Sequence, residues 1–463
     1  VGCEFKNYYC QNFEVSKIMT ARTDIDQVSS NIPGEEGAPR EYGISTLAVH
    51  AGARPDPVTG ARNTPIYNTT SFVFDDSEHA SELFNLQTFG YVYSRMTNPT
   101  VSVFEERIAQ LEGGRGAVAA ASGHAAQFLV AVSLLEAGDE FIASRNLYGG
   151  SVTQFGVSFP KLGWKCHFVD PTDPQNFEDA ITDRVKFIFC EGVANPGGII
   201  LDIERISEIA NKHGVLLIVD NTLASPYLMR PFDWGADLVL HSTTKFIGGH
   251  GNTMGGIVVE SGKIDWFRND KYPGMSQPDT AYHGLTFAET FGDFGFTMRT
   301  RMVALRDYGA TLYPTAAWNL LQGVETLPLR MQRHCDNAQA VAEWLEKHPK
   351  VNWVSYAGLK ASPFYELGQK YLPKGKGAVF TFGIKGGFDA GVKLIDCVEL
   401  HSHLANIGDT RSLILHPAST THRQLSDEQR EGAGAGADVV RLSVGIEDVD
   451  DIIADLEQAL AQL

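Results

Sequence analysis

Between residues 101 and 300, short apolar runs alternate with amphipathic stretches, and this alternation limits the possible folds more than any other feature of the chain. The apolar runs predict strands at residues 117–121, 140–143, 166–169, 187–190, 216–219, 238–240 and 257–259. The amphipathic stretches predict helices at residues 124–136, 151–162, 175–182 and 203–213. Uniformly apolar strands separated by helices are typical of a mostly parallel sheet that is covered on both faces. We therefore expect a large α/β domain over residues 101–300.

The C-terminal third has a different pattern. A helix-rich stretch covers residues 297–346, and apolar runs predict strands at 378–383 and 439–443. A final helix is expected at residues 449–463, where apolar residues recur at helical spacing. Residues 301–463 are therefore expected to form a smaller α+β domain.

The residues before the large domain contain few periodic runs. Residues 43–100 are rich in turn residues such as Pro55 and Gly60, which predicts an extended N-terminal arm with short helices. For residues 1–42 we expect disorder or an artificial extension. Met19 is the expected natural start, because the residues before it show no cleavable signal pattern.

Charge and cysteine content exclude several functions. The 38 Lys and Arg against 56 Asp and Glu give a formal net charge of −18, which repels phosphate backbones and anionic membranes. No apolar run is long enough to span a membrane. The six cysteines form no C-x-x-C pair, which is typical of free thiols in a reducing compartment. We therefore expect a cytoplasmic protein that binds neither nucleic acid nor membranes.

Lys245 is the first candidate for a chemical role. It follows a buried apolar run and the hydroxyl-bearing residues Ser242, Thr243 and Thr244, and a glycine-rich loop comes after it. Most lysines in loops are simply solvated. A lysine that is partly desolvated can instead become neutral and form a Schiff base with an aldehyde. Ser242 and Thr244 would then be hydroxyl donors to a neighbouring anion.

Asp220 lies at the end of another apolar run, about one strand–helix unit before Lys245. Taken alone, it is more typical of a residue that caps a turn. A carboxylate at the carboxyl end of a parallel strand also points into the crevice where α/β ligands bind. Beside Lys245, it suits a partner for a pyridinium nitrogen, which would make that ring an electron sink.

Two further turns follow strands of the same predicted sheet. Ser122, Gly123 and His124 precede a helix, where free N–H groups and the helix dipole can hold a phosphate. Tyr148 precedes two glycines, and its ring suits stacking on a planar cofactor. Either turn alone is equally typical of a structural loop. Because these turns, Asp220 and Lys245 all follow strands of one sheet, their convergence predicts a single site.

These elements resemble the Cys/Met-metabolism family of pyridoxal-phosphate enzymes, which includes cystathionine γ-synthases, methionine γ-lyases and O-acetylhomoserine sulfhydrylases. The resemblance runs from about Ile44 to the C-terminus, and its densest part lies between Ala236 and Gly251. It implies the fold type I of pyridoxal-phosphate transferases, the cofactor pyridoxal 5′-phosphate and a small amino-acid substrate. It also implies a homotetramer built from dimers with shared active sites.

The resemblance assigns roles around the cofactor. Lys245 matches the lysine that binds it and carries protons, and Asp220 matches the partner of the ring nitrogen. Tyr148 matches the stacking tyrosine, a candidate acid for the leaving group, and Asn195 matches the residue bonded to the ring hydroxyl. Lys245, Tyr148 and Asp220 are thus the implied catalytic residues. The full implied cofactor-binding set is Tyr93, Arg95, Ser122, Gly123, His124, Tyr148, Asn195, Asp220, Thr222, Ser242, Thr244 and Lys245.

The resemblance also implies substrate contacts. Arg441 matches the arginine that holds the substrate α-carboxylate through two hydrogen bonds, and Asn406 is the second substrate-binding candidate. Tyr93 and Arg95 match a motif that reaches the phosphate of the neighbouring subunit. Two positions depart from the family pattern, which commonly has Met at His124 and often Ser at Asn406.

Within the family, residues 406–422 and 46–52 most resemble O-acetylhomoserine sulfhydrylases. This implies that sulfide or a thiol replaces the acetate of O-acetyl-L-homoserine to give L-homocysteine, in methionine and cysteine biosynthesis. Gly150 stands where methionine γ-lyases have a cysteine, which counts against that activity. Cystathionine γ-synthase and methionine γ-lyase remain the alternatives within the family.

Three other interpretations are less favoured. The glycines after Lys245 suggest a nicotinamide oxidoreductase, but they miss the dinucleotide-binding spacing. A non-catalytic binding protein on this fold would not need the full set of candidate residues. His401 and His403 lack a third ligand at helical spacing, so no metal site is expected.

Overall fold

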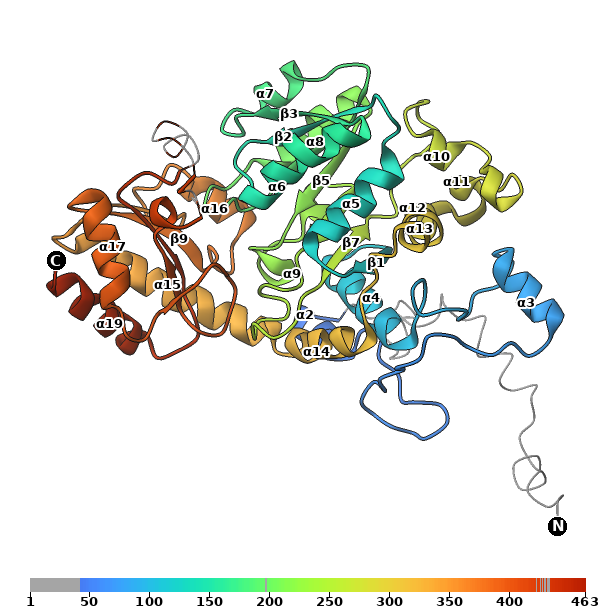
Figure 1. Ribbon diagram of the computed structural model, residues 1–463, viewed down its shortest axis with the longest axis horizontal. Coiled ribbons are helices and arrows are strands. Elements are labelled where there is room, and N and C mark those ends of the chain that lie inside the picture. The colour runs from blue at the N-terminus through green and yellow to red at the C-terminus, as the bar shows by residue number, and fades with distance from the viewer. Residues whose placement is uncertain are drawn as a thin grey trace, which may run out of the picture.

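The computed structural model describes residues 42–195, 198–421 and 434–463, together with residues 423, 424, 426, 428 and 430. This part of the chain contains two β-sheets with helices packed around them (Figure 1). The expectations for residues 1–41, including a natural start at Met19, lie outside the described residues, as do Cys3 and Cys10.

The larger sheet has seven strands in the order β1-β7-β6-β5-β4-β2-β3. The strands are β1 (Gly116–Ala120), β2 (Glu140–Ser144), β3 (Lys165–Val169), β4 (Val185–Glu191), β5 (Leu216–Asp220), β6 (Leu238–His241) and β7 (Gly256–Glu260). Each matches a predicted strand within two residues at either end. Neighbours among β2 to β6 are parallel, whereas β7 runs antiparallel to both β1 and β6. The prediction of a mostly parallel sheet is confirmed.

The antiparallel direction of β7 follows from its connection to β6. Parallel neighbours need a crossover, usually through a helix. Residues 242–255 form no helix and return directly, so β7 pairs with β6 in the opposite direction. This return loop carries Lys245.

Two separate cores cover the faces of the larger sheet, because side chains alternate along each strand. In β5, Leu217 and Val219 lie in one core, and Leu216 and Ile218 lie in the other. The first core includes residues of α4 (Pro99–Glu112) and α8 (Ile203–His213), and the second includes residues of α5 (Gly123–Leu134). Burial on both faces explains why the strands lack polar alternation.

The helix expected at 151–162 is not a continuous α-helix. It consists of α6 (Gly149–Thr153), a π-helical turn at Gln154–Ser158 and a 3-10 turn at Phe159–Leu162. Pro160 lacks the N–H that an α-helix would use, and Gly156 adds backbone freedom. The remaining helices around the larger sheet are α7 (Gln175–Asp179), α9 (Ser225–Leu228), α10 (Pro273–Ser276), α11 (Phe287–Phe291), α12 (Gly295–Arg299) and α13 (Arg306–Tyr308).

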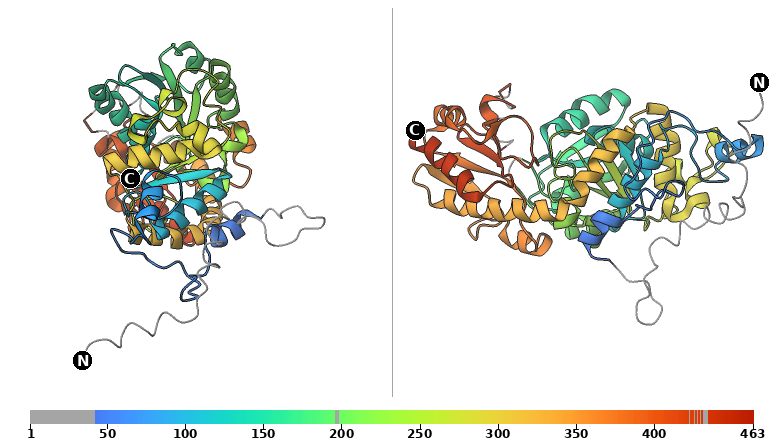
Figure 2. Two further views of the ribbon diagram at one scale, coloured as in Figure 1. Left: turned by 90° about the vertical axis from the view of Figure 1, so that its right-hand side faces the viewer. Right: turned by 90° about the horizontal axis from the view of Figure 1, so that it is seen from below.

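The smaller sheet lies in the C-terminal third and has the order β10-β11-β12-β9-β8. Its strands are β8 (Val351–Ser355), β9 (Val379–Ile384), β10 (Ser402–His403), β11 (Leu413–Leu415) and β12 (Val439–Ser443). Its helices are α14 (Pro314–Glu325), α15 (Leu327–Lys347), α16 (Tyr365–Tyr371), α17 (Gly387–Cys397) and α19 (Val449–Ala461). The long helix α15 reaches from the side of the larger sheet to the smaller one (Figures 1 and 2).

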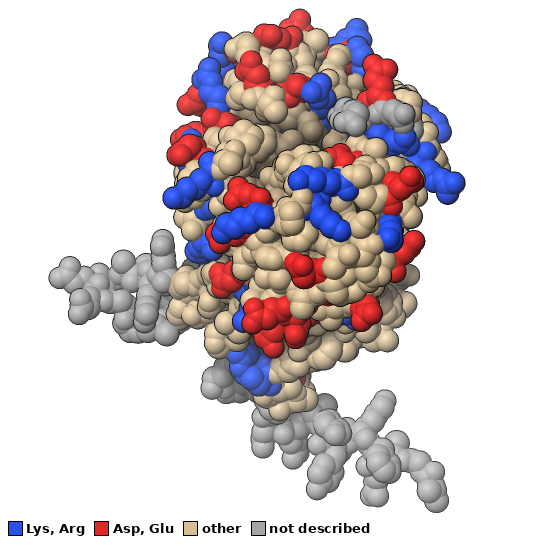
Figure 3. All heavy atoms as spheres, turned by 90° about the vertical axis from the view of Figure 1, so that its left-hand side faces the viewer, with Lys and Arg blue, Asp and Glu red and all other residues tan. Residues whose placement is uncertain are grey.

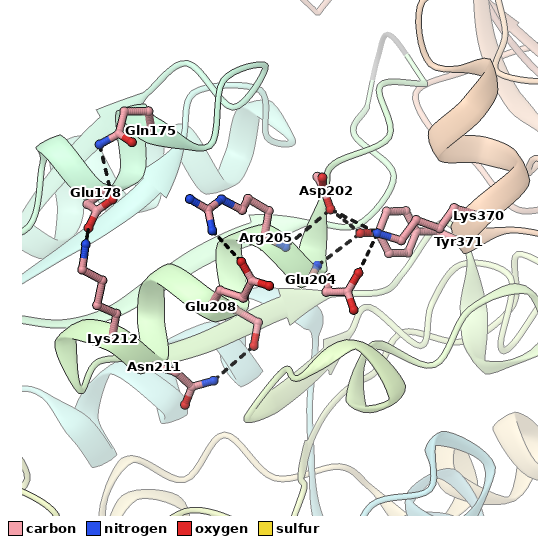
Figure 4. Close-up of polar contacts among 11 residues, drawn as sticks. Gln175, Glu178, Asp202, Glu204, Arg205, Glu208, Asn211, Lys212, Lys370 and Tyr371 are labelled. Carbon is pink, nitrogen blue, oxygen red and sulfur yellow. Dashed lines mark hydrogen bonds and ion pairs between the residues drawn. The ribbon is translucent and has the colours of Figure 1, made fainter.

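A polar clamp joins the two sheet regions at the start of α8 (Figure 4). Lys370 and Tyr371 of α16 contact Asp202 and Glu204, which lie at the N-terminus of α8. The Lys370 Nζ lies 2.7 Å from Glu204 Oε2, and the Tyr371 hydroxyl donates to Asp202 Oδ1. Asp202 also caps α8 by accepting from the Arg205 N–H. The clamp therefore holds the end of the loop that carries Asn195.

Residues 42–100 contain the short helices α2 (Ile44–His50) and α3 (Ser77–Phe84). Helix α3 lies at the end of the molecule farthest from the smaller sheet (Figure 2). Apolar side chains are exposed around it, including Val73 at 95%, Phe84 at 62% and Phe89 at 58%. Such a concentration of exposed apolar groups is typical of a contact surface.

Among the described residues, the helices are too short or too polar to cross a membrane. On the face formed by the C-terminal part, basic and acidic side chains are interspersed (Figure 3). This face carries no broad basic area of the kind that nucleic acids bind.

Candidate active site

The predicted site residues follow strands of the larger sheet at one edge. Ser122 follows β1, Tyr148 follows β2, Asp220 ends β5 and Lys245 follows β6. Strands β2, β4, β5 and β6 run parallel, and β1 shares their direction because both β1 and β6 oppose β7. Their carboxyl ends therefore lie at the same edge, where open α/β sheets bind ligands.

Lys245 is partly buried, and its amine is held by a polar neighbour. The Lys245 Nζ donates a hydrogen bond to Asn406 Oδ1 at 2.5 Å. Burial, followed by the positive charge of Arg441, lowers the pKa of Lys245 to about 8. The neutral amine that can attack an aldehyde is therefore accessible near neutral pH. Arg330 of α15 supports this loop by donating to the carbonyls of Phe246 and Ile247 at 2.8 and 3.2 Å.

Asp220 is a buried carboxylate at the end of β5. Its Oδ1 accepts hydrogen bonds from the N–H of Thr222 at 3.0 Å and from the Thr222 hydroxyl at 2.5 Å. Burial raises the pKa of Asp220 above its ordinary value, although both bonds from Thr222 oppose this. A neighbouring cation would compensate for the burial of the carboxylate. Thr222 also links this strand end to the next, because its hydroxyl accepts from the Ser242 N–H at 2.8 Å.

The turn before α5 packs closely against the loop that carries Lys245. Ser122 caps α5 by accepting from the Ala125 N–H, and Gly123 is the first residue of the helix. A Cβ at Gly123 would lie 2.8 Å from the Cβ of Ser242, so only glycine fits this approach. The helix start offers N–H groups without intrahelical partners beside the Ser242 hydroxyl. The Thr244 hydroxyl, in contrast, already has a backbone partner, because it accepts a hydrogen bond from the Gly255 N–H at 3.0 Å.

Tyr148 and Asn195 are joined by Glu191, the last residue of β4. Glu191 Oε1 accepts from the Tyr148 N–H at 2.6 Å, and Oε2 accepts from the Asn195 N–H at 3.1 Å. Glu191 lies opposite Asp220 in the β4–β5 register. Burial, followed by the charge of Asp220, raises the pKa of Glu191 above its ordinary value.

The ring of His124 fills the space between Gly150 and Tyr148. The centroids of the His124 and Tyr148 rings are 5.7 Å apart, and a Cβ at Gly150 would lie 2.6 Å from His124 Cε1. Any side chain at position 150 would therefore require the His124 ring or the Tyr148 ring to move. Tyr148 itself remains 53% exposed, so one side of its ring is open to a ligand.

The smaller sheet contributes Arg441, which lies on β12, to the site. Its guanidinium donates to Asn195 Oδ1 at 3.4 Å and to the Asn406 carbonyl at 3.2 Å. Burial lowers the pKa of Arg441 to about 10. Among the described residues, no carboxylate forms an ion pair with it. A partly buried guanidinium without an acidic partner is suited to a ligand carboxylate.

Tyr93 and Arg95 do not join this cluster within the single chain. The Arg95 guanidinium donates to the Arg306 carbonyl at 2.6 Å and lies 5.3 Å from the centre of the Tyr93 ring. Both residues are exposed and lie in the segment that follows α3. The predicted contact with a neighbouring subunit stays a prediction.

Three residues missed at the sequence level support the site from the opposite face of the sheet. Glu112 of α4 is fully buried; its Oε1 lies 2.5 Å from His241 Nε2 and accepts from Asn221 Nδ2 at 2.9 Å. His241 and Asn221 adjoin Ser242 and Asp220 in the chain. Glu191 was missed as well. His241 and Glu191 each stand directly after an apolar run, as Asp220 does, and that signal could have marked them, whereas the sequence around Glu112 and Asn221 gives no such signal.

The two histidines weighed as a metal pair have separate surroundings. His401 is buried, and its Nδ1 lies 2.7 Å from Asp455 Oδ2, while His403 is exposed. Within the described ranges, no three His, Cys, Asp or Glu side chains group as metal ligands would.

The geometry fits pyridoxal phosphate. The helix start at Gly123 suits its phosphate, and Lys245 supplies an amine of lowered pKa for its aldehyde. Both hydrogen bonds that Asp220 accepts within the described chain reach Oδ1, which leaves Oδ2 for a protonated ring nitrogen. The open side of Tyr148 can cover the ring.

Comparisons with known proteins agree with this geometry. Residues 45–461 match the model of the family described as Cys/Met metabolism PLP-dependent enzyme. An O-acetyl-L-homoserine sulfhydrylase from Leptospira meyeri is 48% identical over 93% of this chain and 99% of its own. A homocysteine synthase from Schizosaccharomyces pombe is 49% identical over 90% of this chain and 98% of its own. A crystal structure from Campylobacter jejuni, named as a candidate O-acetylhomoserine (thiol)-lyase with N′-pyridoxyl-lysine-5′-monophosphate, has a TM-score of 0.88 and 38% identity, covering 91% of this chain and 100% of that one.

Proposed function

The chain belongs to the Cys/Met metabolism family of PLP-dependent enzymes, and from this premise we propose that it replaces the acetate of O-acetyl-L-homoserine by sulfide or a thiol, giving L-homocysteine. The observation that carries the proposal is the position of Lys245. Its amine, with a pKa of about 8, donates to the Asn406 side chain, and the Arg441 guanidinium donates to the carbonyl of the same Asn406. A proton-transferring amine next to a carboxylate-binding guanidinium is the arrangement that α-amino acid chemistry requires.

Pyridoxal phosphate, when bound, supplies an electron sink that no side chain offers. The residues proposed to hold it are Ser122, Gly123, His124, Tyr148, Asn195, Asp220, Thr222, Ser242, Thr244 and Lys245, with Tyr93 and Arg95 from the neighbouring subunit. Asp220 keeps the ring nitrogen protonated, because a buried carboxylate is stabilised by a cation beside it.

The side chains divide the remaining work. Arg441 holds the substrate α-carboxylate through its planar guanidinium, which fixes the Cα–H bond relative to Lys245. Lys245 Nζ takes the proton from Cα and a second proton from Cβ as acetate leaves, and it returns protons to these carbons once sulfur has bonded to Cγ. The Tyr148 hydroxyl donates to the departing acetyl oxygen. The bond from Cγ to oxygen breaks with both electrons on acetate, and sulfide forms the new bond to Cγ.

A product assay tests this proposal. The purified protein is given O-acetyl-L-homoserine, O-succinyl-L-homoserine or L-methionine separately, with and without sulfide, and with cysteine in place of sulfide. We expect homocysteine and acetate from the first substrate only when sulfide is present. Cystathionine formed from cysteine would indicate a cystathionine γ-synthase, and methanethiol from methionine would indicate a methionine γ-lyase. Gly150, which stands where methionine γ-lyases have a cysteine, argues against the latter, since a Cβ there would lie 2.6 Å from the His124 ring.

The proposal includes a homotetramer of dimers in the cytoplasm. The exposed apolar side chains around α3 support a subunit contact through the N-terminal arm. The free thiols of Cys166, Cys190, Cys335 and Cys397 are consistent with a reducing compartment.

A further inference from the structure

Glu191 is a buried carboxylate next to the proposed cofactor site, and the proposed reaction assigns it no role. It is buried at the end of β4, directly opposite Asp220, and in-register residues of parallel strands present their side chains on the same face of the sheet. Phe187 and Phe189, which alternate with it along β4, belong to the same core as α5. The Glu191 carboxylate therefore lies on the face of the proposed cofactor site.

The two oxygens of Glu191 serve two different loops. Oε1 accepts from the N–H of Tyr148, which follows β2, and Oε2 accepts from the N–H of Asn195, which follows β4 itself. The distance from the Tyr148 nitrogen to Glu191 Oε1, 2.6 Å, is short for an N–H···O hydrogen bond. One rigid carboxylate thus sets the separation between these loops.

We propose that Glu191 is a positioning residue that holds Tyr148 over the cofactor ring and Asn195 beside the ring hydroxyl, at a fixed distance from Asp220. This inference rests on the proposed function, because the roles of Tyr148 and Asn195 come from it. Glu191 acts through these residues and does not touch the reacting atoms. Asn195 extends the effect to the substrate, since its side-chain Oδ1 accepts from Arg441.

The variant Glu191→Gln tests whether Glu191 positions the two loops or only fills buried space. A glutamine has almost the same shape, but only one of its two terminal atoms can accept a hydrogen bond. Whichever way the amide turns, either the Tyr148 N–H or the Asn195 N–H loses its acceptor and faces another N–H group. The variant Glu191→Asp tests the same point by length, because a side chain one carbon shorter cannot reach both loops.

Glu260 offers a matched control in the same sheet. It is buried and accepts from the Thr297 N–H at 2.8 Å, as Glu191 accepts from backbone N–H groups. It lies opposite Leu238 at the start of β6, so it is at the edge away from the site. Glu260→Gln therefore removes a buried carboxylate of the same kind without touching the cofactor loops.

The experiment compares holoenzyme and apoprotein of the wild type and the variants Glu191→Gln, Glu191→Asp and Glu260→Gln. The readouts are urea unfolding of the apoprotein, the dissociation constant for pyridoxal phosphate, the visible circular dichroism of the bound cofactor, and kcat and KM. For both Glu191 variants we expect about tenfold weaker cofactor binding, an altered dichroic band and a kcat that falls about tenfold or more. Glu260→Gln should lower stability comparably and leave the cofactor signals within twofold of the wild type.

Two results would overturn the inference. One is an unchanged dichroic band and kcat in Glu191→Gln and Glu191→Asp. The other is an equal change in Glu260→Gln, which would mean that loss of stability alone explains the effect. A wild type that binds no pyridoxal phosphate would instead contradict the proposed function, so the two failures are distinguishable.

Discussion

At the residue scale, the lowered pKa of Lys245 has a measurable consequence. A lysine whose pKa falls to about 8 becomes neutral as the pH rises through that value, well below the range of ordinary lysines. The rate at which the apoprotein captures pyridoxal phosphate should therefore rise to a plateau with a midpoint near pH 8. Stopped-flow absorbance of the visible band measures this rate, and N-acetyl-lysine methyl ester corrects for the ionisation of the cofactor itself.

Two variants serve as controls for this pH profile. Lys245→Ala should develop no visible band. Arg441→Gln removes the second cause of the lowered pKa, a positive charge nearby, so its midpoint should move to higher pH. A wild-type midpoint near pH 10 would contradict the assignment of Lys245 as a desolvated amine.

His124 and Gly150 should behave as a coupled pair. A Cβ added at Gly150 would lie 2.6 Å from both the His124 and the Tyr148 rings, so Gly150→Ala forces one of them to move. We expect Gly150→Ala to cost about 1–3 kcal/mol in stability or in transition-state binding, as overpacking does. In the double variant with His124→Ala, the loss should be smaller than the sum of the two single losses. Thermal unfolding and kcat/KM of all four proteins give the coupling, and additive losses would contradict the contact.

At the scale of elements, the strands of the larger sheet were predictable and those of the smaller sheet mostly were not. Strands buried on both faces form continuous apolar runs, as in the first four residues of β5, so the sequence pattern matches the structure directly. β8 is half-exposed, with Trp353 39% exposed, and β10 has only two residues, so neither produces an apolar run. The direction of β7 could not be read from its composition, because it depends on the loop that carries Lys245.

The candidate site shows the same division. Asp220 ends a strand, and Lys245 and Tyr148 lie in the loops that follow strands, where a change from apolar to polar residues marks them in the sequence. The pairing of Glu191 with two loops depends on which strands are neighbours, and β2 and β4 are adjacent only in the folded sheet. Sequence order places β3 between them, so the contact has no local signal.

The clamp between α8 and α16 yields a prediction about stability (Figure 4). The Tyr371 hydroxyl is in a buried side chain, donates to Asp202 and accepts from the Glu204 N–H at 3.3 Å. Tyr371→Phe should therefore lower the free energy of unfolding by about 1–2 kcal/mol. Lys370→Ala on the same helix removes an exposed ion pair and should cost about 0.5 kcal/mol or less. Urea unfolding compares the two, and a larger loss for Lys370→Ala would contradict the view that the buried hydroxyl dominates.

At the scale of the whole molecule, the net charge of −18 contrasts with a site built around Lys245 and Arg441. Surface charge determines which large partners are repelled, whereas a ligand carboxylate responds to the nearest cation. The exposed apolar side chains around α3 lie far from the smaller sheet, and Arg95 follows them in the chain. An assembly that covers these side chains would also carry Arg95 toward another subunit.

Mixing an impaired variant with an inactive one tests this shared site. Arg95→Ala should impair a site through the missing phosphate contact, and Lys245→Ala should inactivate it entirely. If each site takes Lys245 from one chain and Arg95 from the other, a hybrid dimer has one intact site and one doubly defective site. Refolding the two variants together in equal amounts should then recover roughly a quarter of wild-type activity, since half of the dimers are hybrids. Native mass spectrometry verifies that hybrids have formed. If their activity is no higher than the mean of the two separate variants, a site does not combine Lys245 of one chain with Arg95 of the other.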